Sequence, residues 1–169
     1  MSIFGENLQE IMNSRKLSGN ELAKIAGVSQ MAISRLNRSE PTFKTAVRIA
    51  DALQLSLDYL AGKEVEPIFI PPKEWEINFY DNLVSFLETQ NIPKRHLCYA
   101  LNYSTACFTL WKNGALPLFS TLIEISNYLD CSIDKLIGRT NWELHIRYIW
   151  WKKHKNKHKK RQNSRFLCL

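Results

Sequence analysis

The sequence lacks the features that mark secreted and membrane proteins. Only four cysteines occur among its 169 residues, at irregular spacings and all in the second half. No basic stretch followed by an apolar run opens the chain, and no apolar run approaches the roughly 20 residues that span a bilayer. We therefore expect free thiols rather than disulfides, a cytoplasmic protein and no membrane partner.

Catalytic and metal-binding motifs are also missing. The sequence contains no glycine-rich phosphate loop, nucleophile elbow or paired-carboxylate constellation, so we predict no enzyme activity, no cofactor and no small-molecule ligand. His154 and His158 have the H-x3-H spacing of a zinc finger, with Cys168 beyond them. Because no paired cysteines precede them at finger spacing, we predict no metal site.

No segment alternates apolar and polar residues as a half-buried strand does, whereas helical periodicity is frequent. The first example is an apolar stripe at i, i+4, i+7 and i+8, formed by Phe4, Leu8, Ile11 and Met12. This spacing places all four side chains on one face of a helix. We therefore predict an all-α protein.

The sequence repeats itself. A shift of 75 residues aligns Phe4 with Phe79 and, after one inserted residue, a shift of 76 aligns Asp58 with Asp134. Each repeat has the pattern of five short helices, and the two aspartates fall in the first turn of the fifth, where the helix dipole favours negative charge. The predicted regions are a first repeat at 1–63, an extended linker at 64–78, a second repeat at 79–140, and a basic aromatic helix and tail at 141–169.

Helix starts and ends are marked by polar residues and glycine. Ser18 and Glu21 form a capping box, in which serine and glutamate satisfy free backbone donors reciprocally. Gly27 and Asn102 occupy the same place in the two repeats, where a left-handed residue ends the second helix. The predicted N-caps of the third, fourth and fifth helices are Ser29, Ser104, Thr42, Ser56 and Ser132.

The stretch GVSQMAISRLNRSEP, residues 27–41, has the pattern of a helix-turn-helix motif. Gly-Val-Ser joins two short helices, and Ile33 and Leu36 are spaced to point inward. A helix held in this way fits the major groove of DNA, where base pairs present distinct donor and acceptor patterns. The residues left on its outer face are Gln30, Met31, Ser34 and Arg35.

Residues 17–62 closely resemble the lambda-repressor-like (Cro and repressor, XRE-type) helix-turn-helix family. The second repeat resembles it more distantly, and its FTLWKNGALP is similar to the Trp-containing variant of the motif. The resemblance implies two tandem five-helix lambda-repressor-like helix-turn-helix domains, the second divergent. It also implies double-stranded DNA as the partner.

The resemblance places the base-contacting positions at Gln30, Met31 and Arg35, with Ser34 close by. Glutamine pairs bidentately with adenine and arginine with guanine, each pair giving about 1–3 kcal/mol of discrimination, while methionine contacts a thymine methyl. Gly19 departs from the family, which usually has glutamine there as a clamp. The expected phosphate contacts of the first repeat are Ser29, Arg38, Thr42 and Lys44.

The second repeat has lost this outward chemistry. Its outer positions are Thr105, Ala106, Thr109 and Leu110, which offer few hydrogen bonds to base edges. We expect this repeat to contact the DNA backbone or another protein. The alternative is that it also recognises bases, with a preference for thymine methyls. Its expected phosphate contacts are Lys94, Arg95 and Lys112.

The leading interpretation is a sequence-specific transcriptional regulator, more specifically a repressor of bacterial or phage type. One module alone buries too little surface for tight binding, so we predict a homodimer on a palindrome, with the second repeat as the natural dimer surface. An extended linker of 15 residues reaches about 50 Å, enough for one chain to cover both half-sites, but the mismatched helices argue against that arrangement. The alternative function is a protein-interaction adaptor, such as an antirepressor or antitoxin-like partner.

Most of the net charge of +7 lies in residues 141–169, which contain nine Lys or Arg and one Glu. Trp142, Ile146, Ile149 and Trp150 share one helical face, which favours packing against the second repeat. A basic, Trp-rich helix could instead lie on an anionic membrane. The basic run suggests contact with DNA phosphates, and the alternative is a solvated end.

Overall fold

A computed structural model describes residues 2–64 and 77–139. Most of the predicted linker (64–78) and the whole predicted tail (141–169) lie outside the described residues. The expectations for His154, His158 and Cys168 therefore lie outside them too. Both described ranges belong to one compact part of the chain.

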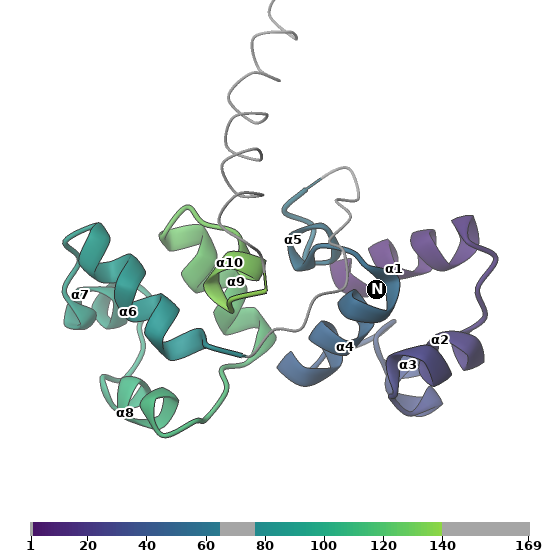
Figure 1. The fold of residues 1–169 in the computed structure, drawn as a ribbon, viewed down its shortest axis with the longest axis horizontal. Coiled ribbons are helices and arrows are strands. Elements are labelled where there is room, and N and C mark those ends of the chain that lie inside the picture. Colours follow the sequence, from purple (N-terminus) through teal and green to yellow (C-terminus); the bar gives the residue numbers. More distant parts are fainter. Residues whose placement is uncertain (1, 65–76, 140–169) are drawn as a thin grey trace, which may run out of the picture. The chain divides into compact units, whose positions relative to one another are not determined.

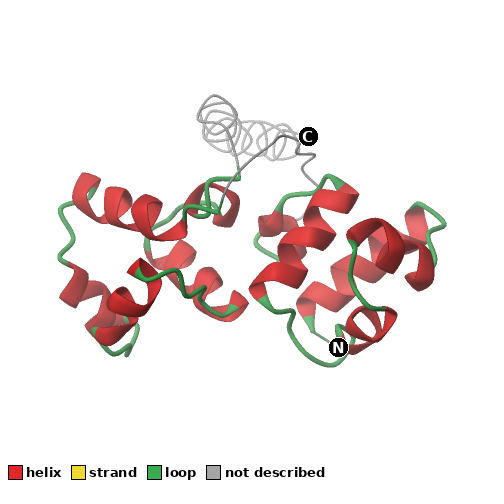
Figure 2. Cartoon of the chain, turned by 60° about the horizontal axis from the view of Figure 1, so that its bottom comes forward, coloured by secondary structure: helices red, strands yellow, loops and turns green. Residues whose placement is uncertain are grey.

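Within the described residues every regular element is an α-helix, as Figure 2 shows, and the predicted all-α class is confirmed there. Five helices lie in residues 2–64, called here the first segment, and five in residues 77–139, the second segment (Figure 1). Those of the first are α1 (Ile3–Ser14), α2 (Gly19–Ala26), α3 (Gln30–Arg35), α4 (Phe43–Leu53) and α5 (Leu57–Leu60). Those of the second are α6 (Phe79–Thr89), α7 (Lys94–Ala100), α8 (Ala106–Lys112), α9 (Phe119–Tyr128) and α10 (Ile133–Leu136).

Polar caps fix the helix starts, as the sequence predicts. At α2 the Ser18 hydroxyl accepts a hydrogen bond from the Glu21 amide, and the Glu21 carboxylate accepts one from the Ser18 amide. Bonds from the Ser18 hydroxyl and amide hold the pKa of Glu21 below its usual range. The predicted caps at α3, α4, α5 and α10 are confirmed by the same type of bond, made by Ser29, Thr42, Ser56 and Ser132.

The start of α8 differs from the prediction. Thr105 holds the N-cap position and makes no side-chain cap bond, while the Ser104 hydroxyl accepts from the amide of Ala106 at 3.3 Å. Thr105 already has a helical backbone, with φ −61° and ψ −21°, so the regular helix begins one residue later than expected. The predicted left-handed residues are confirmed, since Gly27 has φ 63° and Asn102 has φ 56°.

Inward apolar positions form one continuous core of buried residues. The stripe of α1 is buried at Phe4, Leu8, Ile11 and Met12, as its spacing predicts. The short helices α5 and α10 pack against each other and so connect the two segments. The outer positions of α3 and α8 are exposed.

Candidate nucleic-acid interface

The turn between α2 and α3 is defined by local roles of Gly27 and Ser29. Gly27 supplies the left-handed backbone that ends α2, and Ser29 caps α3 by accepting from the Ala32 amide at 3.1 Å. Ile33 and Leu36 are 7% and 3% exposed, which fixes the inner face of α3 in the core. The outer face is thereby held in one orientation.

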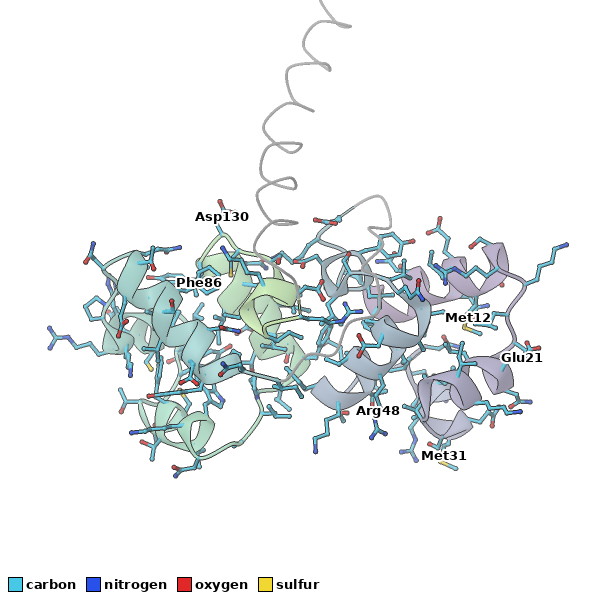
Figure 3. The ribbon with its side chains drawn as sticks, in the orientation of Figure 1. Met12, Glu21, Met31, Arg48, Phe86 and Asp130 are labelled. Atoms are coloured by element: carbon cyan, nitrogen blue, oxygen red, sulfur yellow. The ribbon has the colours of Figure 1, made fainter. Side chains whose placement is uncertain are left out.

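All four predicted base-contacting residues lie on that outer face and are exposed. Figure 3 shows Met31, 61% exposed, projecting outward from α3. Within the described ranges 2–64 and 77–139, the Arg35 guanidinium makes no ion pair. The face therefore offers an amide, a hydroxyl, a thioether and a guanidinium at once, from Gln30, Ser34, Met31 and Arg35.

The predicted phosphate-contacting residues of the first segment surround this face. Ser29, Arg38, Thr42 and Lys44 are all exposed, at the start of α3 and in the stretch that leads into α4. The hydroxyls of Ser29 and Thr42 accept cap bonds from backbone amides. A hydroxyl that accepts such a bond still carries a proton that it can donate to a phosphate oxygen.

Arg48 is a candidate that the sequence did not indicate. It lies on α4, and its Nη1 donates to the Gly27 carbonyl at 3.1 Å, which places an exposed guanidinium beside the turn. Figure 3 shows Arg48 at the same lower edge of the first segment as Met31. The only available signal was a basic residue on the polar side of α4, 21 positions beyond the turn that it contacts.

The structure gives no backbone reason for the glycine at position 19. A Cβ added to Gly19 would meet only Ile33 Cγ2, at 3.8 Å. A hollow of about 270 Å³ lies there, lined by Gly19, Ser34 and Asn37 among others. The side chain that the family usually places at this position therefore has room in this chain.

In the second segment the outward positions of α8 are exposed but chemically poorer. Thr105, Ala106, Thr109 and Leu110 all face solvent, and Leu110 is 59% exposed. They offer two hydroxyls, a methyl group and an isobutyl group, with no amide or guanidinium for bidentate pairing to a base edge.

The basic residues of the second segment differ in the contacts that their side chains make. Lys94 Nζ donates to the Tyr80 hydroxyl at 3.2 Å and lies over the rings of Tyr80 and Phe108, at 5.3 Å and 5.7 Å from their centroids. Arg95 and Lys112 are exposed. Lys94 must therefore leave its aromatic contacts, or share them, in order to bind a phosphate.

The charge beside the turn is reversed in the second segment. Glu124 occupies the aligned position of Arg48, and its carboxylate accepts a hydrogen bond from the Tyr103 hydroxyl. Burial and this bond raise the pKa of Tyr103 to about 12, so the phenol keeps its proton. Where the first segment presents a cation, the second presents an exposed anion that repels phosphate.

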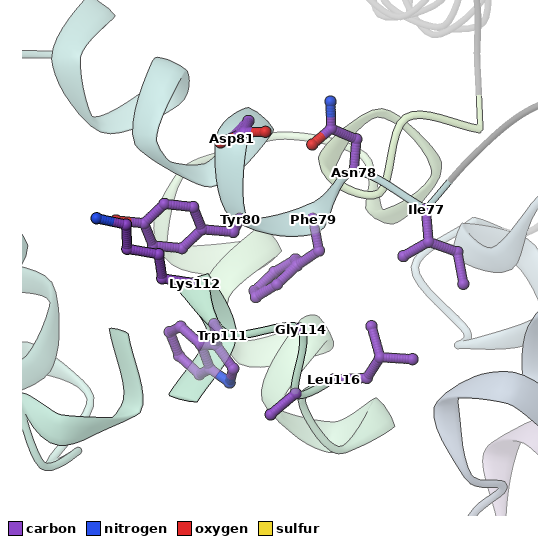
Figure 4. A pocket seen from close by; sticks show the side chains of 10 residues that line it. Ile77, Asn78, Phe79, Tyr80, Asp81, Trp111, Lys112, Gly114 and Leu116 are labelled. Atoms are coloured by element: carbon purple, nitrogen blue, oxygen red, sulfur yellow. The ribbon is translucent and has the colours of Figure 1, made fainter. Parts of the chain in front are cut away.

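A second hollow, of about 560 Å³, lies between the start of α6 and the end of α8 (Figure 4). At the aligned place in the first segment, the Ser2 hydroxyl donates to the Leu36 carbonyl at 2.5 Å and Gly5 lies directly against that carbonyl. A Cβ on Gly5 would come within 2.4 Å of the oxygen. Tyr80 holds the position aligned with Gly5 and cannot approach so closely, which leaves the hollow open.

The cysteines of the described residues are free thiols, as predicted: Cys98, Cys107 and Cys131. Cys98 and Cys107 have their sulfurs 4.0 Å apart, and burial raises the pKa of Cys107 to about 11. Among residues 2–64 and 77–139 no three His, Cys, Asp or Glu side chains gather as metal ligands. No helix in those ranges has both the length and the apolarity to span a bilayer.

Comparison with known proteins finds one family model that matches within the first segment. Residues 8–60 match the family model HTH_3, described as Helix-turn-helix. The chain is 34% identical over 70 residues to YqaE of Bacillus subtilis (strain 168), named as an uncharacterised HTH-type transcriptional regulator. It is 38% identical over 66 residues to RghR of the same organism, named as an HTH-type transcriptional repressor.

These matches cover 40% and 37% of this chain, and 60% and 49% of the two relatives. The chain thus spans about half to three fifths of the length of the curated relatives that it matches. No solved structure matches the chain. Residues 8–60 are thus similar to the HTH_3 model, and they run from within α1 to the end of α5.

Proposed function

We propose that this protein is a sequence-specific, double-stranded-DNA-binding transcriptional regulator that inserts α3 into the major groove. The observation that carries the proposal is the exposed amide and guanidinium of Gln30 and Arg35 on a helix that is capped at one end and buried on its inner face. The names of the two relatives support the regulatory role, and that of RghR supports a repressor. A repressor acts by occupying an operator and blocking polymerase.

In this proposal the residues of α3 divide the work of base recognition. Gln30 pairs with adenine N6 and N7, and Arg35 pairs with guanine O6 and N7. Met31 supplies apolar contact to a thymine methyl, and Ser34 supplies a hydroxyl to a base edge or a phosphate. Such bidentate pairs are the interactions that distinguish one base from another in the major groove.

Phosphate contacts orient the helix on the duplex. The amides and hydroxyl at the start of α3, around Ser29, face the backbone on one side, and Arg38, Thr42 and Lys44 face it on the other. Arg48 joins this group, because its position beside Gly27 adds a cation at the turn. These contacts strengthen binding to all sequences and make it dependent on salt.

We further propose that the chain contains two tandem helix-turn-helix domains, at 1–63 and 79–140, of which the second is divergent. Support comes from the aligned left-handed residues Gly27 and Asn102 and from five helices in each segment. In the second domain Lys94, Arg95 and Lys112 contact phosphates while α8 makes few base contacts. A cytoplasmic location follows from the proposed work on DNA.

The number of chains on the operator is a question separate from the binding of DNA. The sequence favours a homodimer on a palindrome, and no described contact tests that prediction. It requires two chains for each specific site, and the stoichiometry of the complex with DNA decides it.

One observation favours the second candidate, a protein-interaction adaptor. Tyr99, Leu110 and Leu118 of the second segment are 88%, 59% and 71% exposed, so apolar side chains are available there for contact with a protein. On this alternative the chain is itself an antirepressor- or antitoxin-like adaptor that binds a protein partner, and α3 does not select a DNA sequence.

Selection from random-sequence duplexes with the full chain separates the two candidates. We expect a defined motif to be enriched. Gln30→Ala and Arg35→Ala should each weaken binding to it by about 5- to 150-fold, which corresponds to the 1–3 kcal/mol of one bidentate pair. The matched controls are Thr105→Ala and Leu110→Ala at the aligned positions of α8, which should change affinity for that motif by less than about threefold, or 0.6 kcal/mol.

Absence of enrichment at low salt would reject the regulator and leave the adaptor. Circular dichroism of each variant serves as the folding check, because all four substituted side chains are exposed and none contributes to the core.

A further inference from the structure

The fifth helices of the two segments are joined by a pair of reciprocal hydrogen bonds. The Asp134 carboxylate of α10 accepts from the Leu57 amide at the start of α5, at 2.7 Å. The Asp58 carboxylate of α5 accepts from the Ile133 amide at the start of α10, at 2.9 Å and 3.1 Å to its two oxygens. Each aspartate therefore satisfies a free amide at the N-terminus of the opposite helix.

The cations beside these carboxylates are exchanged in the same way. Lys63 Nζ lies 3.4 Å from Asp58 and donates to the Cys131 carbonyl of the second segment at 2.9 Å. The 76-residue shift takes Lys63 to Arg139 and Cys131 to Leu55. Arg139 Nη1 accordingly lies 2.6 Å from Asp134 and donates to the Leu55 carbonyl of the first segment at 2.8 Å.

An interface in which residue i contacts j while the counterpart of i contacts the counterpart of j is isologous and has a two-fold axis. The four reciprocal contacts above have this form, although both surfaces belong to one chain. Three of the four charged groups are closed to water, since Asp58, Asp134 and Arg139 are 3%, 1% and 5% exposed. The contact is thus built like the interface of a symmetric dimer.

This contact leaves the fifth helices unavailable to a second chain. All four residues of α5 are buried: Leu57, Asp58, Tyr59 and Leu60. In α10, Ile133, Asp134 and Leu136 are buried. A second copy of the chain would have to displace the reciprocal aspartates in order to use the same surface.

We propose that one chain is an internal dimer, which binds an operator alone and reads a non-palindromic site. The proposal rests on the proposed function in DNA binding. The approximate two-fold relates α3 to α8, so both helices approach the same duplex, at half-sites about one helical turn apart. Only α3 carries base-pairing side chains, so one half-site is specified by sequence and the other is held through its backbone.

The charges of the second segment fit that division. Arg95 and Lys112 offer cations to phosphates around α8, and the outward Thr105 and Leu110 offer no bidentate pair. Glu124 lies beside the turn, where the first segment has Arg48, and its negative charge weakens the binding of the second segment to DNA phosphates without abolishing it. The specified half-site and the unspecified one therefore differ in both selectivity and strength.

The first test is the stoichiometry of the full chain on its selected duplex, measured by sedimentation equilibrium, together with hydroxyl-radical footprinting. We expect one chain per duplex. Backbone protection should cover two patches about one helical turn apart, with sequence enrichment under one patch only. A palindromic motif bound by two chains would overturn the internal dimer and leave the proposed function intact.

The second test restores the missing chemistry. Thr105→Gln combined with Leu110→Arg copies Gln30 and Arg35 onto α8 at exposed positions. Selection with this double variant should return a second, inverted copy of the original half-site, at a fixed spacing and still with one chain per duplex. An unchanged motif for a folded variant would overturn the proposal.

The matched control places the same two side chains outside α8. Tyr99→Gln combined with Leu118→Arg changes exposed residues and alters the net charge equally, so it should return the original motif. A second half-site selected by this control would show that added charge, and not placement on α8, makes the difference, and would overturn the assignment of α8. If selection enriches no motif with the parent chain or with any variant, that different result rejects the proposed function itself.

Discussion

The two segments keep the same inner frame and differ in what they present to solvent. Ile33 in α3 and its aligned Phe108 in α8 are both buried, and the turns before them both contain a left-handed residue. On the outside, Arg35 is aligned with Leu110 and Arg48 with Glu124. The difference indicates which residues serve the fold and which serve binding, because packing constrains only the inner set.

A second difference concerns how tightly the helices close. The absence of a side chain at Gly5 lets α1 lie against the Leu36 carbonyl, whereas Tyr80 at the aligned position leaves a hollow beside Trp111. The end of α3 in the first segment therefore lies directly against α1. The second holds α8 through aromatic contacts, with Phe79 and Trp111 edge to face at 5.3 Å.

The largest expected effect is a difference in stability between variants of Arg139 and Lys63, the two cations of the reciprocal contact. Arg139→Ala leaves Asp134 buried without its partner and should lower the free energy of unfolding by about 3–5 kcal/mol. Lys63→Ala should cost less, about 1–2 kcal/mol, because the Lys63 side chain is 21% exposed and water replaces part of its bonding. Urea unfolding measures both.

Arg38→Ala, at an exposed position, is the control and should stay within about 0.5 kcal/mol of the parent. Equal losses for the two cation variants would show that the contact is less asymmetric in strength than its burial indicates.

The next effect tests the close approach of α1. Gly5→Ala should destabilise the protein by about 1–3 kcal/mol, because the new methyl group would meet the Leu36 carbonyl and push α1 away from α3. Gly19→Ala is the matched control, and it should be neutral or stabilising by up to about 1 kcal/mol, since its methyl group has room. If Gly5→Ala were harmless, the tight packing would not be what distinguishes the segments.

The reciprocal aspartates should give stability a dependence on pH. Burial raises the pKa of Asp134 to about 7, against the lowering effect of Arg139, and burial also raises the pKa of Asp58. The unfolded chain loses these protons near pH 4, so between about pH 4 and 7 the folded state binds more protons and this contribution to stability falls as pH rises. One such proton changes stability by at most about 1.4 kcal/mol per pH unit.

The measurement is the free energy of unfolding across that range for the parent and for Asp134→Asn. The variant lacks the titrating group, so its stability should fall less between pH 5 and 7 than that of the parent. Asp81→Asn removes an exposed carboxylate and should leave the slope as it is in the parent. A slope that is identical in all three proteins would contradict the raised pKa.

The smallest effect concerns Gly19, whose aligned residue in the second segment is Lys94. Gly19→Gln should strengthen DNA binding by roughly two- to tenfold, the contribution of one added hydrogen bond of about 0.5–1.5 kcal/mol. Fluorescence anisotropy with the selected duplex measures this gain, with Gly19→Ala as the control for helix propensity. An affinity no higher than that of Gly19→Ala would show that the missing clamp does not limit the first segment.

Local features were predictable from the sequence because their causes are local. The capping box at Ser18, the cap at Ser29 and the left-handed Gly27 each follow from residues within three or four positions of one another. Arg48 was missed because it bonds to a carbonyl 21 residues away. The start of α8 was predicted wrongly by one residue, because Thr105 has a helical backbone at the N-cap position. Even a local feature can therefore differ from its prediction.

The two aspartates show where prediction from sequence ends. The spacing placed Asp58 and Asp134 correctly in the first turns of the fifth helices, and a favourable interaction with the dipole of their own helix was the expected role. The structure shows that each carboxylate accepts a hydrogen bond at the start of the other helix, from an amide 75 or 77 residues away in sequence. No periodicity within either repeat contains that pairing.

The sequence by itself determined the helices, their caps and the outward chemistry of α3, because short-range spacing decides which side chains share a helix face. Tertiary structure alone decided that the segments meet through exchanged aspartates and that Arg48 reaches the turn, because such contacts depend on the folding of distant segments against a common core. The stretch around Gln30 and Arg35 identifies the surface proposed to bind DNA, and the contact between α5 and α10 supports its use by a single chain.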